Sequence, residues 1–234
     1  MPSTIEDSAG SGDRTLRSEG NVVRQADWFF DFISPYAYLQ FHQLHRLPPD
    51  VEVQFRPVLF AGLLNHWGQL GPAEIHAKKQ HTFLLCRWRA GKMGLPFKAP
   101  PRHPFNPLGL LRMAIANGAD QATAGAIFDH IWAEGQDGQD PESLTTLAST
   151  LGISDIQAAT SDPAVKDTLR ANTEAAVANG VYGVPTFLIE GQTFWGDDML
   201  DMMLEWLADP AFMNDPESQR IMALPPAAER KRNA

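Results

Sequence analysis

The chain has 234 residues, of which 44% are hydrophobic and 20% charged, and this is the composition of an ordinary globular protein. Its net charge of −9 argues against general nucleic-acid binding, and no apolar run approaches the ~20 residues that a membrane-spanning helix needs. Cys86 is the only cysteine, which excludes an intrachain disulfide, a C-x-x-C motif and a zinc site made of thiolates. Because secreted domains usually contain disulfides, we expect a cytoplasmic protein.

The N-terminal part of the chain changes character near residue 22. Residues 1–21 are polar, acidic and rich in glycine, and they lack the apolar core of a signal peptide, so we interpret them as a disordered leader. The following residues, VVRQADWFFDFI (22–33), are rich in β-branched and aromatic side chains. They predict a buried strand near 27–33.

A helix and a second strand follow the first strand. Ser34 has the side chain that helix N-caps favour, and Pro35 suits a first helical turn. The apolar spacing continues to Pro48-Pro49, which ends the helix. VEVQFRPVLF (51–60) alternates between apolar and polar residues, so it predicts a strand. The order β-α-β favours a parallel strand pair and an α/β fold.

The middle of the chain carries helical periods and few strand signals, from residue 61 to about 179. Several of these helical segments start on Asp, Ser or Thr and stop on Gly. Strand signals return at 184–190 and 192–195, and a helical segment follows from residue 197. We therefore predict a discontinuous α/β domain (22–60 and 180–215), a helical insertion domain (61–179) and a C-terminal tail (216–234).

Charge is unevenly distributed along the chain. The segment from Ile75 to Ala119 has no acidic residue, although it contains eight Lys and Arg residues: Lys78, Lys79, Arg87, Arg89, Lys92, Lys98, Arg102 and Arg112. A basic segment in an acidic chain suggests a small anionic ligand. The alternative is a solvated helix face whose acidic partners come from elsewhere in the fold.

Two short motifs resemble the thioredoxin fold. The strand, then Ser34-Pro-Tyr-Ala37, then a helix resembles the C-x-x-C turn of DsbA-type oxidoreductases, with Ser34 and Ala37 at the cysteine positions. GVPT (183–186) resembles the thioredoxin-fold loop that contains a cis-proline. A large helical insertion between the two halves is similar to DsbA and to kappa-class glutathione transferases. The resemblance implies a thioredoxin-like fold.

More closely, the chain resembles 2-hydroxychromene-2-carboxylate isomerases, which belong to the kappa-like, glutathione-dependent group. The matching segments are FDFISPYAYL, RWRAGKMGLPF, DPESL and GVPTFLIEGQTFWGDDML, and they extend over residues 28–207. Where the kappa group often has a Gly-Asn pair, this chain has Gly68-Gln69. In W-G-D-D, Asp197 stands in place of the usual Asn or Ser, and Asp198 matches the expected Asp.

The resemblance implies glutathione as the cofactor, because two cysteines are lacking and a thiol has to come from outside. The hydroxyl of Ser34, at the N-terminus of a helix, would donate a hydrogen bond to the thiolate. The alternative for Ser34 is a plain N-cap. Val184, which precedes Pro185, would offer its backbone to the glutathione peptide, held open by a cis bond. The alternative there is an ordinary trans X-Pro turn.

Further glutathione contacts follow from the same resemblance. Asp198 would bind the γ-glutamyl ammonium or cap the following helix, and Asp197 would do either. Gln69 would contribute a hydrogen bond.

The reaction implied by the resemblance interconverts 2-hydroxychromene-2-carboxylate and trans-o-hydroxybenzylidenepyruvate by reversible thiolate addition. Such a small anionic aromatic substrate needs a cationic clamp. The candidate substrate-binding residues are Tyr36, Trp88, Arg89, His103 and Asn106. Relatives are commonly homodimers, and we expect one here. The histidine pairs His42/His45 and His76/His81 lack carboxylate support, so we expect no metal site.

Two other functions remain open from the sequence. One is a kappa-type glutathione transferase, which product analysis would distinguish from an isomerase. The other is a DsbA-like thiol-binding protein without dithiol redox activity.

Overall fold

The computed structural model describes residues 23–227, so the predicted leader and the last residues of the predicted tail lie outside the described part of the chain. Its longer elements follow in the order β1 (Arg24–Phe30), α1 (Pro35–Phe41), β2 (Val51–Pro57), α2 (Phe60–Trp67), α3 (His76–Lys92), α4 (Leu108–Ala116), α5 (Gln121–Phe128), α6 (Pro141–Thr150), α7 (Ile156–Ser161), α8 (Pro163–Ala178), β3 (Thr186–Ile189), β4 (Gln192–Trp195), α9 (Leu200–Ala208), α10 (Ala211–Asn214) and α11 (Pro216–Met222). Short 3-10 turns occupy Leu44–Arg46, Pro72–Glu74 and Asp197–Met199, and a π-helical segment, Asp129–Ala133, extends α5.

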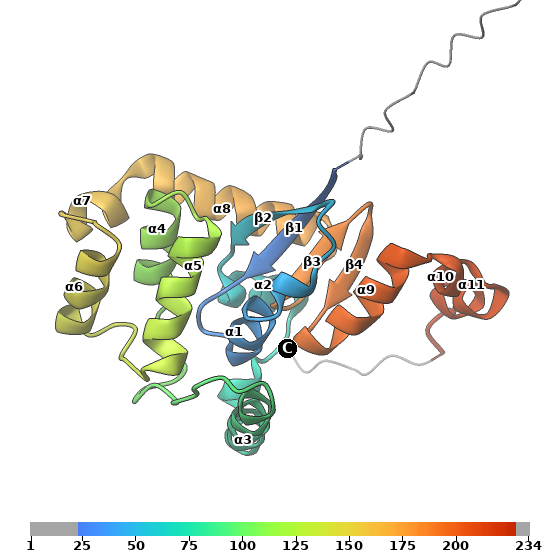
Figure 1. The fold of residues 1–234 in the computed structure, drawn as a ribbon, viewed down its shortest axis with the longest axis horizontal. Coiled ribbons are helices and arrows are strands. Elements are labelled where there is room, and N and C mark those ends of the chain that lie inside the picture. Colours follow the sequence, from blue (N-terminus) through green and yellow to red (C-terminus); the bar gives the residue numbers. More distant parts are fainter. Residues whose placement is uncertain (1–22, 228–234) are drawn as a thin grey trace, which may run out of the picture.

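The four strands form one mixed sheet in the order β2-β1-β3-β4 (Figure 1). β1 and β2 are parallel, with Arg24 opposite Val51, which confirms the pairing predicted from the β-α-β order. β3 is antiparallel to both β1 and β4. The two ends of the chain thus build one sheet, and helices occupy the long connection between β2 and β3. The predicted α/β fold with a helical insertion is confirmed.

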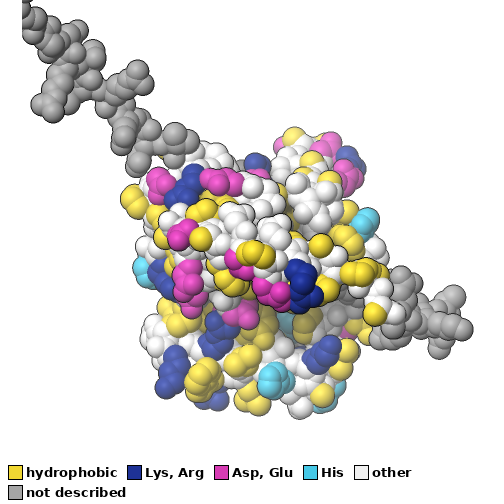
Figure 2. Space-filling model, turned by 90° about the vertical axis from the view of Figure 1, so that its right-hand side faces the viewer, with side chains coloured by type: hydrophobic (Ala, Val, Ile, Leu, Met, Phe, Trp, Pro, Cys, Tyr) yellow, Lys and Arg dark blue, Asp and Glu magenta, His cyan; other side chains and the backbone are white. Residues whose placement is uncertain are grey.

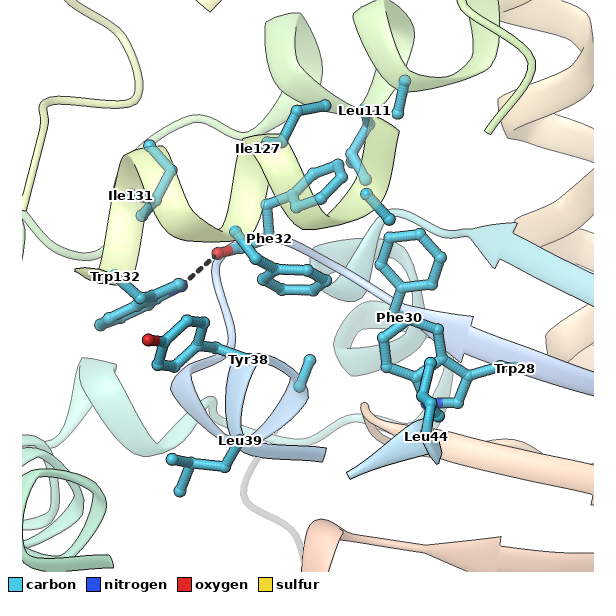
Figure 3. Close-up of a cluster of buried hydrophobic side chains, with 14 of the residues drawn as sticks. Trp28, Phe30, Phe32, Tyr38, Leu39, Leu44, Leu111, Ile127, Ile131 and Trp132 are labelled. Carbon is cyan, nitrogen blue, oxygen red and sulfur yellow. Dashed lines mark hydrogen bonds between the residues drawn. The ribbon is translucent and has the colours of Figure 1, made fainter. Parts of the chain in front are cut away.

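Strand β1 is buried on both faces, and its side chains alternate between two apolar clusters. Trp28 and Phe30 point to one face, where their rings stack with centroids 4.5 Å apart and pack near α1 and α5 (Figure 3). Phe29 points to the other face. An apolar run without simple alternation is expected of a strand covered on both sides.

The face of the sheet that carries Phe29 is covered by α2 and α8. Leu63 of α2 and Ala176 of α8 belong to the same buried cluster as Phe29. The predicted boundaries at 61 and 179 assign both helices to the insertion, although they pack on the sheet. The division of the chain into two domains therefore stays a prediction.

The remaining helices of the connection form a block beside the sheet, with α3 at its lower end in Figure 1. Asp120, Asp140, Asp155 and Asp162 each cap a helix by accepting a backbone N–H. These are the start signals that the sequence predicts. In Figure 2, Lys and Arg side chains lie among hydrophobic ones in the lower part of the molecule, whereas the acidic side chains gather above them.

The range predicted as a tail begins with a helix. Asp215 caps α11 by accepting from Glu217 N and Ser218 N, and Pro216 occupies its first turn. The sequence Asp-Pro-Glu-Ser at 215–218 repeats the helix start at 140–143, so the prediction of a tail from residue 216 missed a signal that the chain carries. Within residues 23–227, no helix is long and apolar enough to cross a membrane.

Candidate functional site

Ser34 lies in the turn between β1 and α1 and has two hydrogen-bonding partners. Its backbone is extended (φ −92°, ψ 114°), and its Oγ accepts from Ala37 N at 3.2 Å, as an N-cap does. The same hydroxyl donates to Val184 O at a longer distance, 3.4 Å. Ser34 is therefore a helix cap whose single hydroxyl proton points to the loop before β3.

The loop before β3 brings the other predicted glutathione contact to Ser34. The Val184–Pro185 peptide bond is cis, and Pro185 O accepts from Gly196 N at 2.9 Å. A side chain at Gly183 has no room, because its Cβ would lie 2.3 Å from Trp195 Nε1. Residues 150 positions apart in the sequence thus meet at one point of the fold.

Asp31 was not among the predicted site residues, but it organises the turn that carries Ser34. Its carboxylate accepts from Ile33 N (3.1 Å) and Phe60 N (2.9 Å), and its carbonyl accepts from Ser34 N (3.1 Å). Asp31 is fully buried, and burial raises its pKa from 3.8 to about 7 despite the two N–H donors. A single acidic residue inside the apolar run FFDFI is the signal that points to it.

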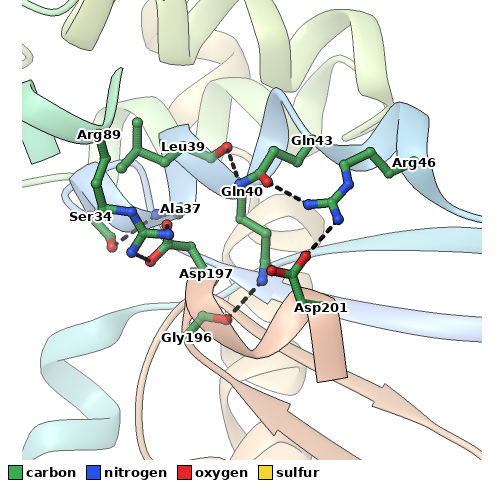
Figure 4. A network of polar contacts seen from close by, with 10 residues as sticks. All are labelled: Ser34, Ala37, Leu39, Gln40, Gln43, Arg46, Arg89, Gly196, Asp197 and Asp201. Atoms are coloured by element: carbon green, nitrogen blue, oxygen red, sulfur yellow. Dashed lines mark hydrogen bonds and ion pairs between the residues drawn. The ribbon is translucent and has the colours of Figure 1, made fainter. Parts of the chain in front are cut away.

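Asp197 and Arg89 form an ion pair across the site (Figure 4). Arg89, on α3, lies 2.7 and 3.0 Å from the two carboxylate oxygens of Asp197, although the shorter contact does not have hydrogen-bond geometry. Burial raises the pKa of Asp197 to about 6, and it outweighs the attraction of Arg89. Asp197 is thus paired with a cation within the protein.

Asp198 is exposed, and no cation among the described residues pairs with it. Two positions before it, Gly196 has a φ of 101°, a backbone conformation that disfavours any side chain, and a Cβ there would lie 2.5 Å from Asp198 Oδ1. Asp198 is the middle residue of the 3-10 turn Asp197–Met199 ahead of α9, and it accepts none of that helix's N-terminal N–H groups as a cap. Of the two roles expected for Asp198, capping α9 is therefore not observed.

Tyr36 and Cys86 lie beside the ion pair. Burial raises the pKa of the Tyr36 hydroxyl, and the interaction with Cys86 acts in the same direction. Cys86 is completely buried on the inner side of α3, and burial followed by the charge of Asp197 raises the pKa of its thiol to about 12.

We expect Cys86 to be unreactive toward thiol reagents in the folded protein, because only a thiolate attacks and this thiol stays protonated. Titration with a chromogenic disulfide should detect less than about a tenth of a thiol per chain before unfolding and a full thiol in denaturant. Replacement by alanine should leave turnover within a few-fold. Rapid labelling of the folded protein would instead make Cys86 a candidate nucleophile.

The other predicted residues divide into those near Ser34 and those elsewhere. His103 lies next to the Ser34 turn, because its Nε2 is 2.8 Å from Ile33 O. Asn106 is exposed and makes a local hydrogen bond within its own loop, where its Oδ1 accepts from Leu108 N. Trp88 is 62% exposed on α3, with Lys92 over its ring. Gln69 is exposed just beyond α2, and no side-chain hydrogen bond within residues 23–227 joins it to Ser34.

The basic segment 75–119, which includes α3, is only partly neutralised by acidic side chains. Arg89 pairs with Asp197, and Arg102 pairs with Asp137, so acidic partners from elsewhere account for two of its eight basic residues. No acidic residue pairs with Arg87 or Lys92 among the described residues. Both side chains are exposed, so this part of α3 presents unpaired positive charge at the surface.

Gln40 is a further residue that the sequence did not reveal. It is buried, accepts from Trp28 Nε1 at 2.6 Å and donates to Gly196 O at 2.9 Å (Figure 4). It thereby joins β1, α1 and the loop that carries Asp197. A polar residue inside a helix gives no sequence signal for such a role.

Metal ligands do not gather in the part of the chain that the structure describes. No group of three or more His, Cys, Asp or Glu side chains lies close enough together there to hold an ion. The expectation that the protein has no metal site stays a prediction.

The amino-acid sequence is similar to those of several known proteins. The family model described as a DSBA-like thioredoxin domain matches residues 25–208. The 2-hydroxychromene-2-carboxylate isomerase of Sphingobium xenophagum is 28% identical over 202 residues, which cover 80% of this chain and all of that protein. Glutathione S-transferase kappa 2 of Caenorhabditis elegans is 28% identical over 205 residues, which cover 78% of this chain and 91% of that protein.

Solved structures show the same fold. The structure of a 2-hydroxychromene-2-carboxylate isomerase matches with a TM-score of 0.69 at 24% identity, over 81% of this chain and 97% of the other. At this identity the match concerns the fold alone. It confirms the thioredoxin-like fold with a helical insertion that the sequence predicts.

Proposed function

Since the chain belongs to the DsbA-like thioredoxin domain family, and since isomerases and kappa-class transferases resemble it over most of its length, we propose that it is a glutathione-dependent isomerase. Its proposed reaction interconverts 2-hydroxychromene-2-carboxylate and trans-o-hydroxybenzylidenepyruvate, or a related aromatic intermediate. The observation that carries the proposal is the hydroxyl of Ser34, which faces Val184 O at the position where the family's redox members have a cysteine. We also propose that it is a cytoplasmic homodimer.

The residues present fit glutathione. Ser34 would donate its hydroxyl proton to the thiolate, which requires the proton to turn away from its long hydrogen bond to Val184 O. The backbone of Val184 and Pro185 would border the glutathione peptide, and the exposed carboxylate of Asp198 would hold the γ-glutamyl ammonium. When bound, glutathione would supply a thiolate that adds reversibly to a conjugated double bond.

Arg89 and Lys92, which is three positions further along α3, are the candidates for holding the substrate carboxylate. The two terminal nitrogens of Arg89 face the carboxylate of Asp197. The Arg89 side chain is 25% exposed, so a substrate can approach it from the solvent side. We propose that Arg89 orients the carboxylate and that Asp197 fixes Arg89. Tyr36 and Trp88 would provide aromatic contacts, and His103 would border the substrate from the loop before α4.

Acidifying the thiol accounts for only part of the expected acceleration. A thiol of pKa about 8.5 is roughly 3% ionised at pH 7, and lowering the pKa by about two units raises this fraction about 25-fold. Intrinsic nucleophilicity falls roughly 6- to 10-fold over the same change. The rate of thiolate attack therefore gains only a few-fold, so the orientation of thiol and substrate has to contribute most of the acceleration.

A kappa-type transferase is the second candidate, because transferases of that class resemble the chain to the same degree as isomerases do. The test is an absorbance assay with each isomer in the presence and absence of glutathione, followed by product analysis. Interconversion without consumption of glutathione supports the isomerase. Accumulation of a stable conjugate supports the transferase, and binding without turnover supports a thiol-binding protein.

Asp198→Ala is expected to weaken glutathione binding about tenfold, which corresponds to about 1.4 kcal/mol, because it removes the proposed partner of the ammonium. Calorimetric titration measures the change. Asp201→Ala is the matched control, since Asp201 is an exposed acid of the adjacent helix that pairs with Arg46. Equal affinities of the two variants would contradict the role given to Asp198.

A further inference from the structure

Two ring nitrogens hydrogen-bond to the backbone of the turn that carries Ser34, and both come from the helical connection between β2 and β3. Phe32 O accepts from Trp132 Nε1 at 2.8 Å, as Figure 3 shows, and Ile33 O faces His103 Nε2 at 2.8 Å. These are the two carbonyls immediately before Ser34. Both donors lie 70 or more positions along the chain from their acceptors, so the helical connection fixes the backbone that sets the place of the hydroxyl.

The Trp132 donor is itself rigidly held. Its side chain is completely buried within the π-helical segment Asp129–Ala133, and its ring stacks on Phe97 with centroids 5.7 Å apart. Its carbonyl accepts from Lys98 N at 2.7 Å. Short π-helical segments in α-helices often occur at functional sites, and this one turns an indole N–H toward the Ser34 turn.

The His103 donor has one possible tautomer when neutral. A carbonyl oxygen only accepts, so Nε2 carries the proton and Nδ1 is bare. Nδ1 is buried and has no hydrogen-bonding partner among the described residues. Burial lowers the pKa of His103, and the charge of Lys79, which donates to the His103 carbonyl, acts in the same direction. The ring is therefore neutral at neutral pH and donates through Nε2.

We propose that Trp132 and His103 are positioning residues for Ser34, an inference that rests on the proposed glutathione site. Neither side chain touches the glutathione thiol in this scheme. They orient the two peptide groups before Ser34 so that its hydroxyl meets the thiolate, and a misplacement of well under 1 Å weakens such an interaction. The helical connection thus takes part in activating the thiol, in addition to bordering the substrate.

Trp132→Phe tests the proposal, because it removes the N–H and keeps most of the ring. We expect the pKa of bound glutathione to rise by about half a unit to one unit and kcat to fall about tenfold. His103→Leu should do the same, and His103→Gln, whose amide can still donate, should recover part of the loss. Thiolate absorbance as a function of pH, kcat and the melting temperature are measured on each variant.

Tyr38→Phe is the matched control. It removes a bond of 2.6 Å from a side chain to the Pro96 carbonyl, which is outside the Ser34 turn. It should lower the melting temperature while leaving the thiolate titration unchanged. A normal titration and normal kcat in folded Trp132→Phe, or in both His103 variants, would overturn the inference. Wild-type protein that binds no glutathione would instead overturn the proposed function itself.

Discussion

Replacing Ser34 by alanine is expected to raise the pKa of bound glutathione by about 1 to 2 units, because a hydrogen bond to a charged group contributes roughly 1.5–3 kcal/mol. Turnover should fall about tenfold, mainly because the thiolate loses the donor that orients it. The melting temperature should also fall, because the Ser34 hydroxyl caps α1 by accepting from Ala37 N, and losing such a cap costs about 1 kcal/mol. Ultraviolet absorbance of the thiolate, followed against pH well below the melting temperature, measures the first effect.

The two roles of Ser34 are separated by a second capping variant. Asp155 caps α7 through the same kind of bond, to Ala158 N at 2.8 Å, and lies in the helical block. Asp155→Ala should lower stability without changing the titration of glutathione. If Ser34→Ala also leaves that titration unchanged, Ser34 is a helix cap only and the thiolate has another partner.

The contribution of Asp31 to the free energy of unfolding is expected to fall as the pH rises from about 4 to about 7. Its carboxyl has a pKa of about 7 in the folded protein and 3.8 ordinarily, so the folded state binds a proton that the unfolded chain has already released. Stability linked to this proton is complete below about pH 4 and is lost by about pH 7. The difference in pKa sets an upper limit of roughly 4 kcal/mol.

Asp31→Asn removes this titration while keeping the size of the side chain. Its unfolding free energy, measured by denaturant titration at several pH values, should change much less between pH 6 and 7 than that of the wild type. At pH 5 the variant should be the less stable protein, because an amide has one oxygen for the two N–H groups of Ile33 and Phe60. An Asp197→Asn variant should alter the pH dependence of the unfolding free energy at lower pH, below about pH 6. An unchanged pH profile in Asp31→Asn would contradict the raised pKa.

The sequence predicted the fold well where local signals and the chain order agree. The parallel pairing of β1 and β2 follows from a strand, a capped helix and a second strand. The limits of β1 were less accurate: the expected range near 27–33 lies three residues beyond Arg24–Phe30. The strand ends earlier because Asp31 uses its carboxylate to bind the backbone of the following turn, and an apolar run does not reveal this.

Residues of the candidate site were predictable from the sequence only where they stand in a recognisable motif. Ser34, Val184, Pro185 and Asp198 stand in recognisable motifs, and the structure brings Ser34 and Val184 together. The ion pair of Arg89 with Asp197 depends on how α3 lies against the sheet, which no local pattern contains. Trp132 and Gln40 act through single hydrogen bonds across long sequence separations, so their roles required coordinates.

The position of β3 in the sheet has a consequence for the order of biosynthesis. β1 pairs with β2 on one side and with β3 on the other, but β3 begins only at Thr186. A nascent chain therefore presents one unpaired edge of an apolar strand while the whole helical connection is being translated, which is the kind of edge that recruits chaperones or aggregates. Premature termination before Thr186 would leave that edge open permanently and would leave Ser34 without the loop opposite it. The sheet around the turn that carries Ser34 is therefore completed only after the helical connection has been made.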